Sequence, residues 1–309
     1  MRLIDRYFYK PLWWQKILIF LLLPISYFYC LCAYLKRKLS TKLDFGIPII
    51  SVGNLVVGGS GKTPFIIQIA NAFPDRKIAI ISRGYKRKSK GLVIVSNQGT
   101  IQCSPQESGD EPYLIAQSVK HATVIVCKNR KQAILQAKEM RNEIVFLDDG
   151  FRFNFKKLNI VLKPKLQPYY PFCLPSGMYR EWKHLDQEAD LVIQEGEDYV
   201  REVSVKNATK RMLLVTAIAS PSRLEEFLPD VVGKIYYPDH ATFQTKELQE
   251  KIQQYNATSL LITSKDYVKL KDTGFELSLL ELQLRIKDSV LQTIATYIQG
   301  ELSNESPTL

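Results

Sequence analysis

Apolar residues form one long, uninterrupted run near the start of the chain. Residues 17–35 read ILIFLLLPISYFYCLCAYL, nineteen positions without a charged side chain. Nineteen helical residues rise about 28 Å, close to the thickness of a hydrocarbon core. Trp13 and Trp14 precede the run and Tyr34 lies near its end, where aromatic residues mark membrane interfaces. The pattern predicts a membrane-anchor helix within residues 1–40.

Two alternatives to a membrane helix are a cleaved signal peptide and a buried core helix. A signal peptide has a shorter apolar stretch followed by small residues at a cleavage site, and a core helix at the extreme N-terminus is rarely apolar all round. Membrane association is favoured over both. Pro24 leaves a kinked or re-entrant path open. The nearly symmetric basic flanks set no orientation, but they suit anionic headgroups on a cytoplasmic face.

Short apolar segments alternate with amphipathic ones after residue 40. Near-continuous apolar strands separated by helices predict an α/β fold with a parallel sheet covered on both faces. The expected strands cover residues 48–52, 77–82, 123–127, 144–147, 159–162 and 191–193, and the expected helices cover 64–73, 111–119 and 130–140.

A second series of alternating segments begins at residue 212. Its expected strands start with residues 212–219 and continue with 234–237, 259–263 and 277–286; its expected helices cover 221–227 and 245–255. We predict a second, smaller α/β domain over residues 206–300, followed by a polar tail at 301–309.

A glycine-rich loop follows the first strand of the larger domain. Residues 51–63 read SVGNLVVGGSGKT, and a helix is expected to follow. Glycines let successive N–H groups turn toward phosphate oxygens, and the helix N-terminus adds positive potential. Val56 stands where the strict phosphate-loop pattern requires glycine, yet the strand–loop–helix frame favours this loop over a plain glycine turn. Its expected nucleotide-binding residues are Gly58, Gly59, Ser60, Gly61, Lys62 and Thr63.

Two carboxylates follow a buried strand, in the segment EIVFLDDG at residues 143–150. One of Asp148 and Asp149 is expected to hold Mg²⁺ beside the Thr63 hydroxyl, and Lys62 is expected to reach the β- and γ-phosphates. An exposed Asp-Asp-Gly turn is the alternative; it is disfavoured because a phosphate loop is present. Residues 41–205 are therefore expected to form a P-loop ATP-binding domain.

Four further polar residues are candidates for acceptor chemistry or for phosphate contacts. Asp110 in SGDEP is either a helix N-cap or a base that accepts a hydroxyl proton. His240 in YPDHATF is either an ordinary surface histidine or a partner that orients a nucleophile. Arg83 and Arg180 lie in basic segments and have the geometry that suits phosphate contacts.

The net charge limits the classes of binding partner, and the cysteine content indicates the redox state of the compartment. The formal net charge of +11 suits nucleic acid, anionic membranes or phosphorylated ligands. Nucleic acid is not expected, because no basic stripe with stacking aromatics is present. The five cysteines are odd in number and contain no CxxC pair, so buried reduced thiols are expected rather than disulfides or zinc. No obligate protein partner is evident.

The motifs, taken in order, resemble those of the tetraacyldisaccharide 4'-kinase family. The resemblance is carried by SVGNLVVGGSGKTP, ISRGY, GDEP, FLDDGF, LPSGMYRE, YPDHATF and ITSKD, which span residues 51–266. It implies an inner-membrane protein with its catalytic part on the cytoplasmic face, ATP and Mg²⁺, and a lipid-linked disaccharide 1-phosphate that is phosphorylated at its 4'-hydroxyl. It also implies two α/β/α units joined by a hinge, with the substrate between them.

The same resemblance assigns roles to particular residues. Lys62 binds the phosphates and counts among the catalytic residues. Asp110 aligns with the catalytic aspartate and His240 with the histidine of an Asp–His dyad, while Arg180 and Glu181 match a substrate-side pair. Arg152 and Phe153 depart from the usual Gln-His, and Ser264 departs from the usual Glu. A membrane-associated P-loop NTPase that acts as a switch or partitioning factor is the alternative function.

Overall fold

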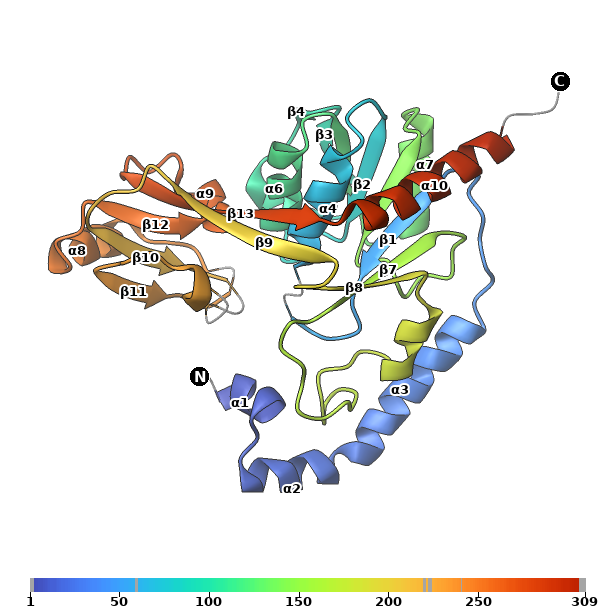
Figure 1. Cartoon of the computed structure of the whole chain (residues 1–309), viewed down its shortest axis with the longest axis horizontal. Coiled ribbons are helices and arrows are strands. Elements are labelled where there is room, and N and C mark those ends of the chain that lie inside the picture. The colour runs from blue at the N-terminus through green and yellow to red at the C-terminus, as the bar shows by residue number, and fades with distance from the viewer. Residues whose placement is uncertain (1–2, 59–60, 219–220, 222–223, 240, 306–309) are drawn as a thin grey trace.

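The computed structural model describes residues 3–58, 61–218, 221, 224–239 and 241–305. Its main body is an eight-stranded sheet with the strand order β4-β3-β5-β2-β6-β1-β7-β8 (Figure 1). The strands are β1 (Ile49–Gly53), β2 (Ile78–Ser82), β3 (Val93–Asn97), β4 (Thr100–Ile101), β5 (Ala122–Val126), β6 (Ile144–Asp148), β7 (Leu158–Lys163) and β8 (Leu191–Gln194).

The sheet is mixed rather than purely parallel. The six strands from β5 to β8 are parallel to their neighbours, as the apolar segments predicted. At the other edge β3 pairs antiparallel with both β4 and β5, so the prediction of a parallel sheet is wrong there. The cause is a tight hairpin, in which Gln98 and Gly99 both have positive φ (44° and 83°) and reverse the chain between β3 and β4.

Helices cover both faces of this sheet, because alternate side chains of each buried strand point to opposite sides. On one face Ile50 packs with α4 (Lys62–Asn71), α6 (Asp110–Ser118) and α10 (Asp288–Glu305). On the other face Ile49 packs with α7 (Arg130–Glu139). The short helix α5 (Pro105–Ser108) precedes α6, and the 3₁₀ helix η1 (Lys183–Glu188) precedes β8.

A second sheet has the order β11-β10-β12-β13-β9. Its strands are β9 (Tyr199–Lys206), β10 (Met212–Thr216), β11 (Gly233–Tyr236), β12 (Ser259–Thr263) and β13 (Leu277–Ile286), with α8 (Thr245–Gln254) and α9 (Ser264–Leu270) between them. Where a helix was expected at 221–227, the structure describes a 3₁₀ turn, η3 (Glu225–Phe227).

Two strands and one helix connect the two sheets. β9 lies ahead of the expected start of the second unit, yet it pairs antiparallel with β13 along its whole length, from Tyr199↔Ile286 to Lys206↔Leu279. β13 then leads into α10, whose residues Ile294 and Ile298 are buried in the core of the first sheet. Figure 1 shows this β9–β13 ribbon running between the two sheets.

The N-terminal segment is three helices rather than one anchor helix. These are α1 (Leu3–Tyr9), α2 (Trp13–Leu21) and α3 (Leu23–Lys38), and the axes of α2 and α3 differ by 50°. The single-helix prediction is wrong because Pro24, in the first turn of α3, breaks the run, one of the outcomes it left open. Among the described residues no single helix is long and apolar enough to cross a bilayer, although α2 and α3 together satisfy both criteria.

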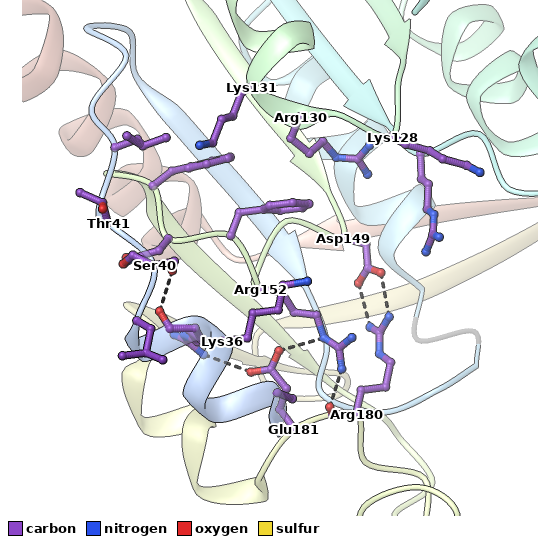
Figure 2. A pocket seen from close by; sticks show the side chains of 18 residues that line it. Lys36, Ser40, Thr41, Lys128, Arg130, Lys131, Asp149, Arg152, Arg180 and Glu181 are labelled. Atoms are coloured by element: carbon purple, nitrogen blue, oxygen red, sulfur yellow. Dashed lines mark hydrogen bonds and ion pairs between the residues drawn. The ribbon is translucent and has the colours of Figure 1, made fainter. Parts of the chain in front are cut away.

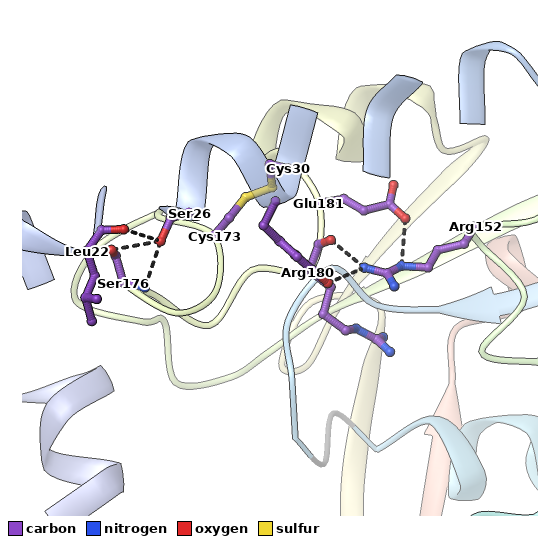
Figure 3. The surroundings of a disulfide bond; sticks show 9 residues. Leu22, Ser26, Cys30, Arg152, Cys173, Ser176, Arg180 and Glu181 are labelled. Atoms are coloured by element: carbon purple, nitrogen blue, oxygen red, sulfur yellow. Dashed lines mark hydrogen bonds and ion pairs between the residues drawn. A yellow bond between two sulfur atoms is a disulfide. The ribbon is translucent and has the colours of Figure 1, made fainter. Parts of the chain in front are cut away.

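The expectation that all cysteines are reduced is also wrong for one pair. Cys30 on α3 and Cys173 form a disulfide, with their Cα atoms 6.3 Å apart (Figure 3). The two residues are 143 positions apart in sequence, so no local spacing pointed to the pairing. Nearby, Ser26 Oγ donates to Ser176 Oγ over 2.8 Å. These contacts fasten α3 to the loop that leads to Arg180.

Candidate active site

Adjacent parallel strands bring the glycine-rich loop and the paired carboxylates to one edge of the sheet. β1 pairs with β6 so that Val52 lies opposite Asp148, and the Asp149 N–H donates to the Val52 carbonyl over 2.9 Å. Gly61 is the N-cap of α4 with φ of 80°, a conformation that favours glycine. Lys62 and Thr63 are therefore the first two residues of α4. Gly58 has φ of 106°, while Gly59 and Ser60 lie outside the described residues.

Asp148 is a buried acid within this edge. Its side chain accepts a hydrogen bond of 2.8 Å from Ser82 Oγ at the end of β2. Burial is the main influence and raises the pKa of Asp148 to about 6, although the nearby Lys62 charge opposes that rise. Such a carboxyl group favours a compensating cation at neutral pH.

Asp149 has a different environment. Its backbone adopts the left-handed region, with φ of 57°, and its carboxylate makes two hydrogen bonds of 2.8 Å with the Arg180 guanidinium. Burial alone would raise the pKa of Asp149, but the bonds from Arg180 and the charge of Lys62 outweigh it and lower that pKa to about 2. The two adjacent acids therefore differ in their preference for a proton.

A short backbone pairing brings Arg180 to this edge. The Val57 N–H donates to the Met178 carbonyl and the Arg180 N–H donates to the Leu55 carbonyl, both over 2.8 Å. Val56 is 4% exposed and bridges to Tyr179. The residue that departs from the strict phosphate-loop pattern thus joins the loop to the segment that carries Arg180.

A cavity of about 870 Å³ opens beside Asp149 and Arg180. Eight of its lining side chains are lysine or arginine and two are carboxylates. Figure 2 shows cations from α3, α7 and the loops after β6 facing this space. Its cationic residues are Lys36, Arg37, Arg83, Lys128, Arg130, Lys131, Arg152 and Arg180. The cavity therefore suits an anionic ligand.

Arg130 lies in the wall of this cavity but is itself buried. Its guanidinium donates to the Asp148 carbonyl over 3.1 Å and to the Cys127 carbonyl. Burial lowers the pKa of Arg130 while the Asp148 charge opposes the change. Arg83, by contrast, is exposed and lines the same cavity.

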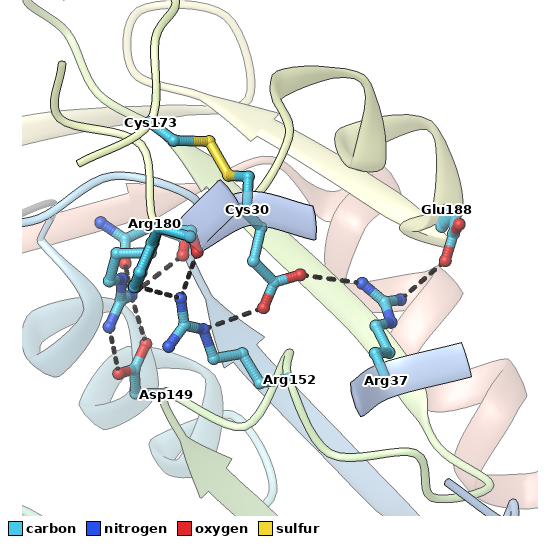
Figure 4. Close-up of polar contacts among 10 residues, drawn as sticks. Cys30, Arg37, Asp149, Arg152, Cys173, Arg180 and Glu188 are labelled. Carbon is cyan, nitrogen blue, oxygen red and sulfur yellow. Dashed lines mark hydrogen bonds and ion pairs between the residues drawn. A yellow bond between two sulfur atoms is a disulfide. The ribbon is translucent and has the colours of Figure 1, made fainter. Parts of the chain in front are cut away.

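Glu181 is held by cations from α3 and from the loop after β6. Its carboxylate is held by Arg37 Nη1 of α3 at 3.2 Å and by Arg152 Nε at 2.9 Å (Figure 4). Arg37 also pairs with Glu188 at 2.8 Å, and Arg152 donates to the Arg180 carbonyl. Glu181 is 4% exposed, so its contacts are those of a structural clamp. Arg152 belongs to that clamp.

Asp110 lies at the start of α6, facing the second unit. It is the first residue of the helix, and its N-cap is Gly109, so the interpretation of Asp110 as the N-cap is wrong. Lys269 of α9 pairs with Asp110 at 3.2 Å, and Lys265 lies between Glu111 at 3.6 Å and Asp239 at 3.3 Å. His240 lies outside the described residues, and its role stays a prediction.

The donor set suits a magnesium ion that is shared with a nucleotide. Among the described residues, no cluster of three or more His, Cys, Asp or Glu is placed to hold a metal ion alone. Thr63, Asp148 and Asp149 supply one hydroxyl and two carboxylates at the loop edge. Mg²⁺ commonly takes one or two protein carboxylates and completes its shell with phosphates and water, so these residues fit that ion.

Several residues at the site were missed from sequence. Asn54 accepts a bond from Lys62 Nζ at 3.0 Å and from Arg180 Nη2 at 2.7 Å. It lies inside the segment SVGNLVVGGSGKT, where only the glycines, Ser60, Lys62 and Thr63 were assigned roles. Ser82, Arg130 and Lys269 were also unassigned. Ser82 and Lys269 have partners far away in sequence, and Arg130 bonds backbone carbonyls, so no side-chain pattern indicated these residues.

Comparisons with known proteins show which family the chain resembles. A family model described as LpxK, tetraacyldisaccharide-1-P 4'-kinase, matches residues 18–299. Proteins named tetraacyldisaccharide 4'-kinase are similar: that of Helicobacter acinonychis (strain Sheeba) is 57% identical over 296 residues, covering 96% of this chain and 94% of its own. That of Aliarcobacter butzleri (strain RM4018) is 45% identical over 306 residues, covering 96% and 97%.

A solved structure shares the fold. It is described as the "apo" form of LpxK from Aquifex aeolicus in complex with ATP, and its TM-score against this chain is 0.76. The sequences are 28% identical, and the match covers 91% of this chain and 99% of that one.

Proposed function

The chain belongs to the tetraacyldisaccharide-1-phosphate 4'-kinase family, and we propose how its own residues carry out that reaction. It is an ATP-dependent kinase that phosphorylates the 4'-hydroxyl of a tetraacyldisaccharide 1-phosphate in lipid A biosynthesis. The geometric observation that carries the mechanism is that the phosphate loop and the paired acids meet at the carboxyl ends of β1 and β6. Lys62 donates to Asn54 directly after β1, and Arg180 bonds both Asn54 and Asp149.

Lys62 and the loop N–H groups hold the phosphates of ATP at the N-terminus of α4, where the helix dipole also favours an anion. Thr63, Asp148 and Asp149 are the residues that would hold Mg²⁺, which would supply positive charge to the phosphates when bound. Lys62 and Arg180 place positive charge where the transferred phosphoryl group gains negative charge. This arrangement supplies positioning and charge stabilisation.

Asp110 is the base in this proposal. It accepts the proton of the 4'-hydroxyl as that oxygen bonds to the γ-phosphorus and the bond to the β-phosphate oxygen breaks, which releases ADP. Asp110 is 3.2 Å from Lys269 of the second unit. The position of Asp110 between the units supports a role at an interdomain acceptor site, and His240 is its proposed partner.

The cationic cavity is the proposed site for the phosphorylated sugar end of the lipid. Lys36 and Arg37 of α3 line it, so the end of the N-terminal helices forms part of its rim. Side chains on α2 and α3 expose apolar surface, including Phe20 (52%), Leu21 (73%), Ile25 (58%) and Phe28 (66%). We infer that α2 and α3 bind the inner membrane from its cytoplasmic face and present the lipid headgroup to the cavity.

One assay tests the proposal. The purified protein is incubated with labelled ATP and lipid A disaccharide 1-phosphate, and the 4'-phosphorylated product is sought by mass. We expect product with the wild type and none with Lys62→Ala. Hydrolysis of ATP without product, unaffected by the disaccharide, would instead support the switch-type NTPase.

A further inference from the structure

Asn54 lies between the phosphate loop and the segment that carries Arg180. It is 3% exposed, and it follows β1 directly. Its carboxamide oxygen accepts hydrogen bonds from Lys62 Nζ at 3.0 Å and from Arg180 Nη2 at 2.7 Å. Arg180 Nη2 also donates to the Asn54 backbone carbonyl at 3.0 Å. One residue thus contacts both the nucleotide-side cation and the acceptor-side cation.

The partners determine which way the Asn54 amide points. Its Nδ2 donates to the Val56 carbonyl over 2.8 Å. The lysine ammonium and the arginine guanidinium are donors only, so the atom that faces them must be the oxygen. A rotated amide would place its NH₂ group against two cations and its oxygen against a carbonyl. The orientation is therefore set by chemistry.

The shared oxygen solves an electrostatic problem at this site. Lys62 and Arg180 carry like charges and repel one another when they are drawn together. A buried oxygen that accepts charge-assisted hydrogen bonds from both offsets that repulsion. Arg180 also donates from Nη1 and Nη2 to the two carboxylate oxygens of Asp149, each over 2.8 Å. A connected series, Lys62–Asn54–Arg180–Asp149, thus crosses the site.

We propose that Asn54 is a positioning residue that fixes Lys62 and Arg180 relative to each other before the substrates bind. This inference rests on the proposed function, in which Lys62 contacts ATP and Arg180 the acceptor. Substrates then meet cations already in place, which lowers the barrier for a reaction that depends on positioning. Asn54 acts through those two residues and needs no contact with either substrate.

Asn54→Ala is the first test, with two readouts. ATP affinity is measured by calorimetry without acceptor, and the KM for the disaccharide 1-phosphate is measured by product formation. We expect ATP affinity to fall and the KM for the disaccharide to rise, each roughly tenfold. Asn54→Ala removes one hydrogen bond to charged Lys62 and one to charged Arg180. The matched control is Asn142→Ala, because Asn142 is a buried asparagine whose amide donates to the Ala137 carbonyl, away from the site. Both parameters should stay near wild type in that control.

A double variant that also lacks the Arg180 side chain separates a positioning role of Asn54 from a general loss of structure. In Arg180→Ala, the added Asn54→Ala change should still weaken ATP binding through Lys62 but should no longer raise the acceptor KM. Two outcomes would overturn the proposal. One is a further tenfold rise of the acceptor KM when Asn54→Ala is added to Arg180→Ala; the other is an unchanged ATP affinity in Asn54→Ala alone. Should Asn54→Ala fail to fold, Asn54→Ser removes the shared carboxamide oxygen while keeping a small polar side chain. The same changes in ATP affinity and acceptor KM are expected for that variant.

A different result would show that the proposed function itself is wrong. A wild-type protein that binds ATP but phosphorylates no disaccharide contradicts the kinase assignment. The ATP-affinity comparison between wild type, Asn54→Ala and Asn142→Ala does not need the acceptor, so it judges the Lys62 contact of Asn54 in either case.

Discussion

The guanidinium of Arg180 and the carboxylate of Asp149 form two parallel hydrogen bonds, each 2.8 Å long. The pair joins the acceptor-side segment to the edge that carries the phosphate loop. Its fork-to-fork geometry needs the planar guanidinium, because a lysine ammonium presents one point charge.

Arg180→Lys is therefore expected to lower kcat/KM for the acceptor by roughly tenfold or more, since one ammonium cannot hold Asp149 and Asn54 together. Thermal stability should change little, because the pair is partly exposed. Steady-state kinetics and thermal unfolding measure the two effects. The control is Arg76→Lys, since Arg76 forms a surface pair with Glu143; it should leave kcat/KM unchanged. A wild-type kcat/KM in Arg180→Lys would contradict the bidentate role.

Asp148 gives the protein a pH-dependent stability. Burial raises its folded-state pKa to about 6, above the ordinary aspartate value of 3.8, so the folded state holds this proton more tightly than the unfolded state. The resulting penalty is absent below about pH 4 and grows until about pH 6. Asp148→Asn should remove it and stabilise the ligand-free protein at about pH 8 by up to roughly 3 kcal/mol.

Denaturant unfolding without nucleotide at about pH 4 and about pH 8 measures that difference. The exposed residue Asp75 supplies the control, and Asp75→Asn should show no pH-dependent gain. Equal stabilisation by Asp148→Asn at both pH values would show that the carboxylate charge is not the cause. Kinase activity should be lost in Asp148→Asn at either pH.

Asp110→Asn should lower kcat by roughly 10²- to 10⁴-fold, because the amide cannot accept the hydroxyl proton. ATP affinity should stay close to wild type, since Asp110 lies on α6 rather than on the phosphate loop. Single-turnover transfer and ATP calorimetry distinguish these effects. Asp272→Asn changes an exposed acid with a weak lysine contact and should transfer phosphate normally. Phosphoryl transfer at a near-wild-type rate by Asp110→Asn would show that Asp110 is not the general base.

The exposed apolar surface of α2 and α3 predicts binding to lipid. Leu21→Arg combined with Ile25→Arg places two charges where side chains are 73% and 58% exposed, and flotation with anionic liposomes should fall several-fold, because charge opposes burial in the interface. Leu135→Arg alters a side chain on α7 that is 51% exposed and should float like wild type. Unchanged flotation of the double variant would exclude this surface as the anchor.

Local patterns predicted the central sheet and its loops well. The strand, glycine loop and helix at residues 49–71 lie next to each other in sequence, so their apolar and glycine patterns were sufficient. The same holds for Asp148 and Asp149 after β6. Asn54 and Arg180 are 126 positions apart, and only the folded chain brings them together. Sequence reasoning cannot weigh such contacts without knowing the fold.

Several elements were not predicted from the sequence, among them β3, β4, α9, β9 and α10. β9 (Tyr199–Lys206) alternates buried and exposed side chains, but its charged residues hid the strand pattern. α10 was not predicted because its apolar residues, among them Ile294 and Ile298, pack on the first sheet, which lies far away in sequence. Pro24 left a break in the N-terminal run open, but the docking of α3 through Ser26 and Cys30 depends on partners far away in sequence.

The path of the chain through β9, β13 and α10 makes the second unit an insertion within the first. Because α10 buries Ile294 and Ile298 in the nucleotide-side core, cutting the chain after β12 would damage the kinase core rather than cleanly detach an accessory unit. The two strands that connect the units, β9 and β13, are hydrogen-bonded to each other. The units should therefore bend about this pair of strands more easily than they rotate around its long axis, so domain opening and closing should follow one direction.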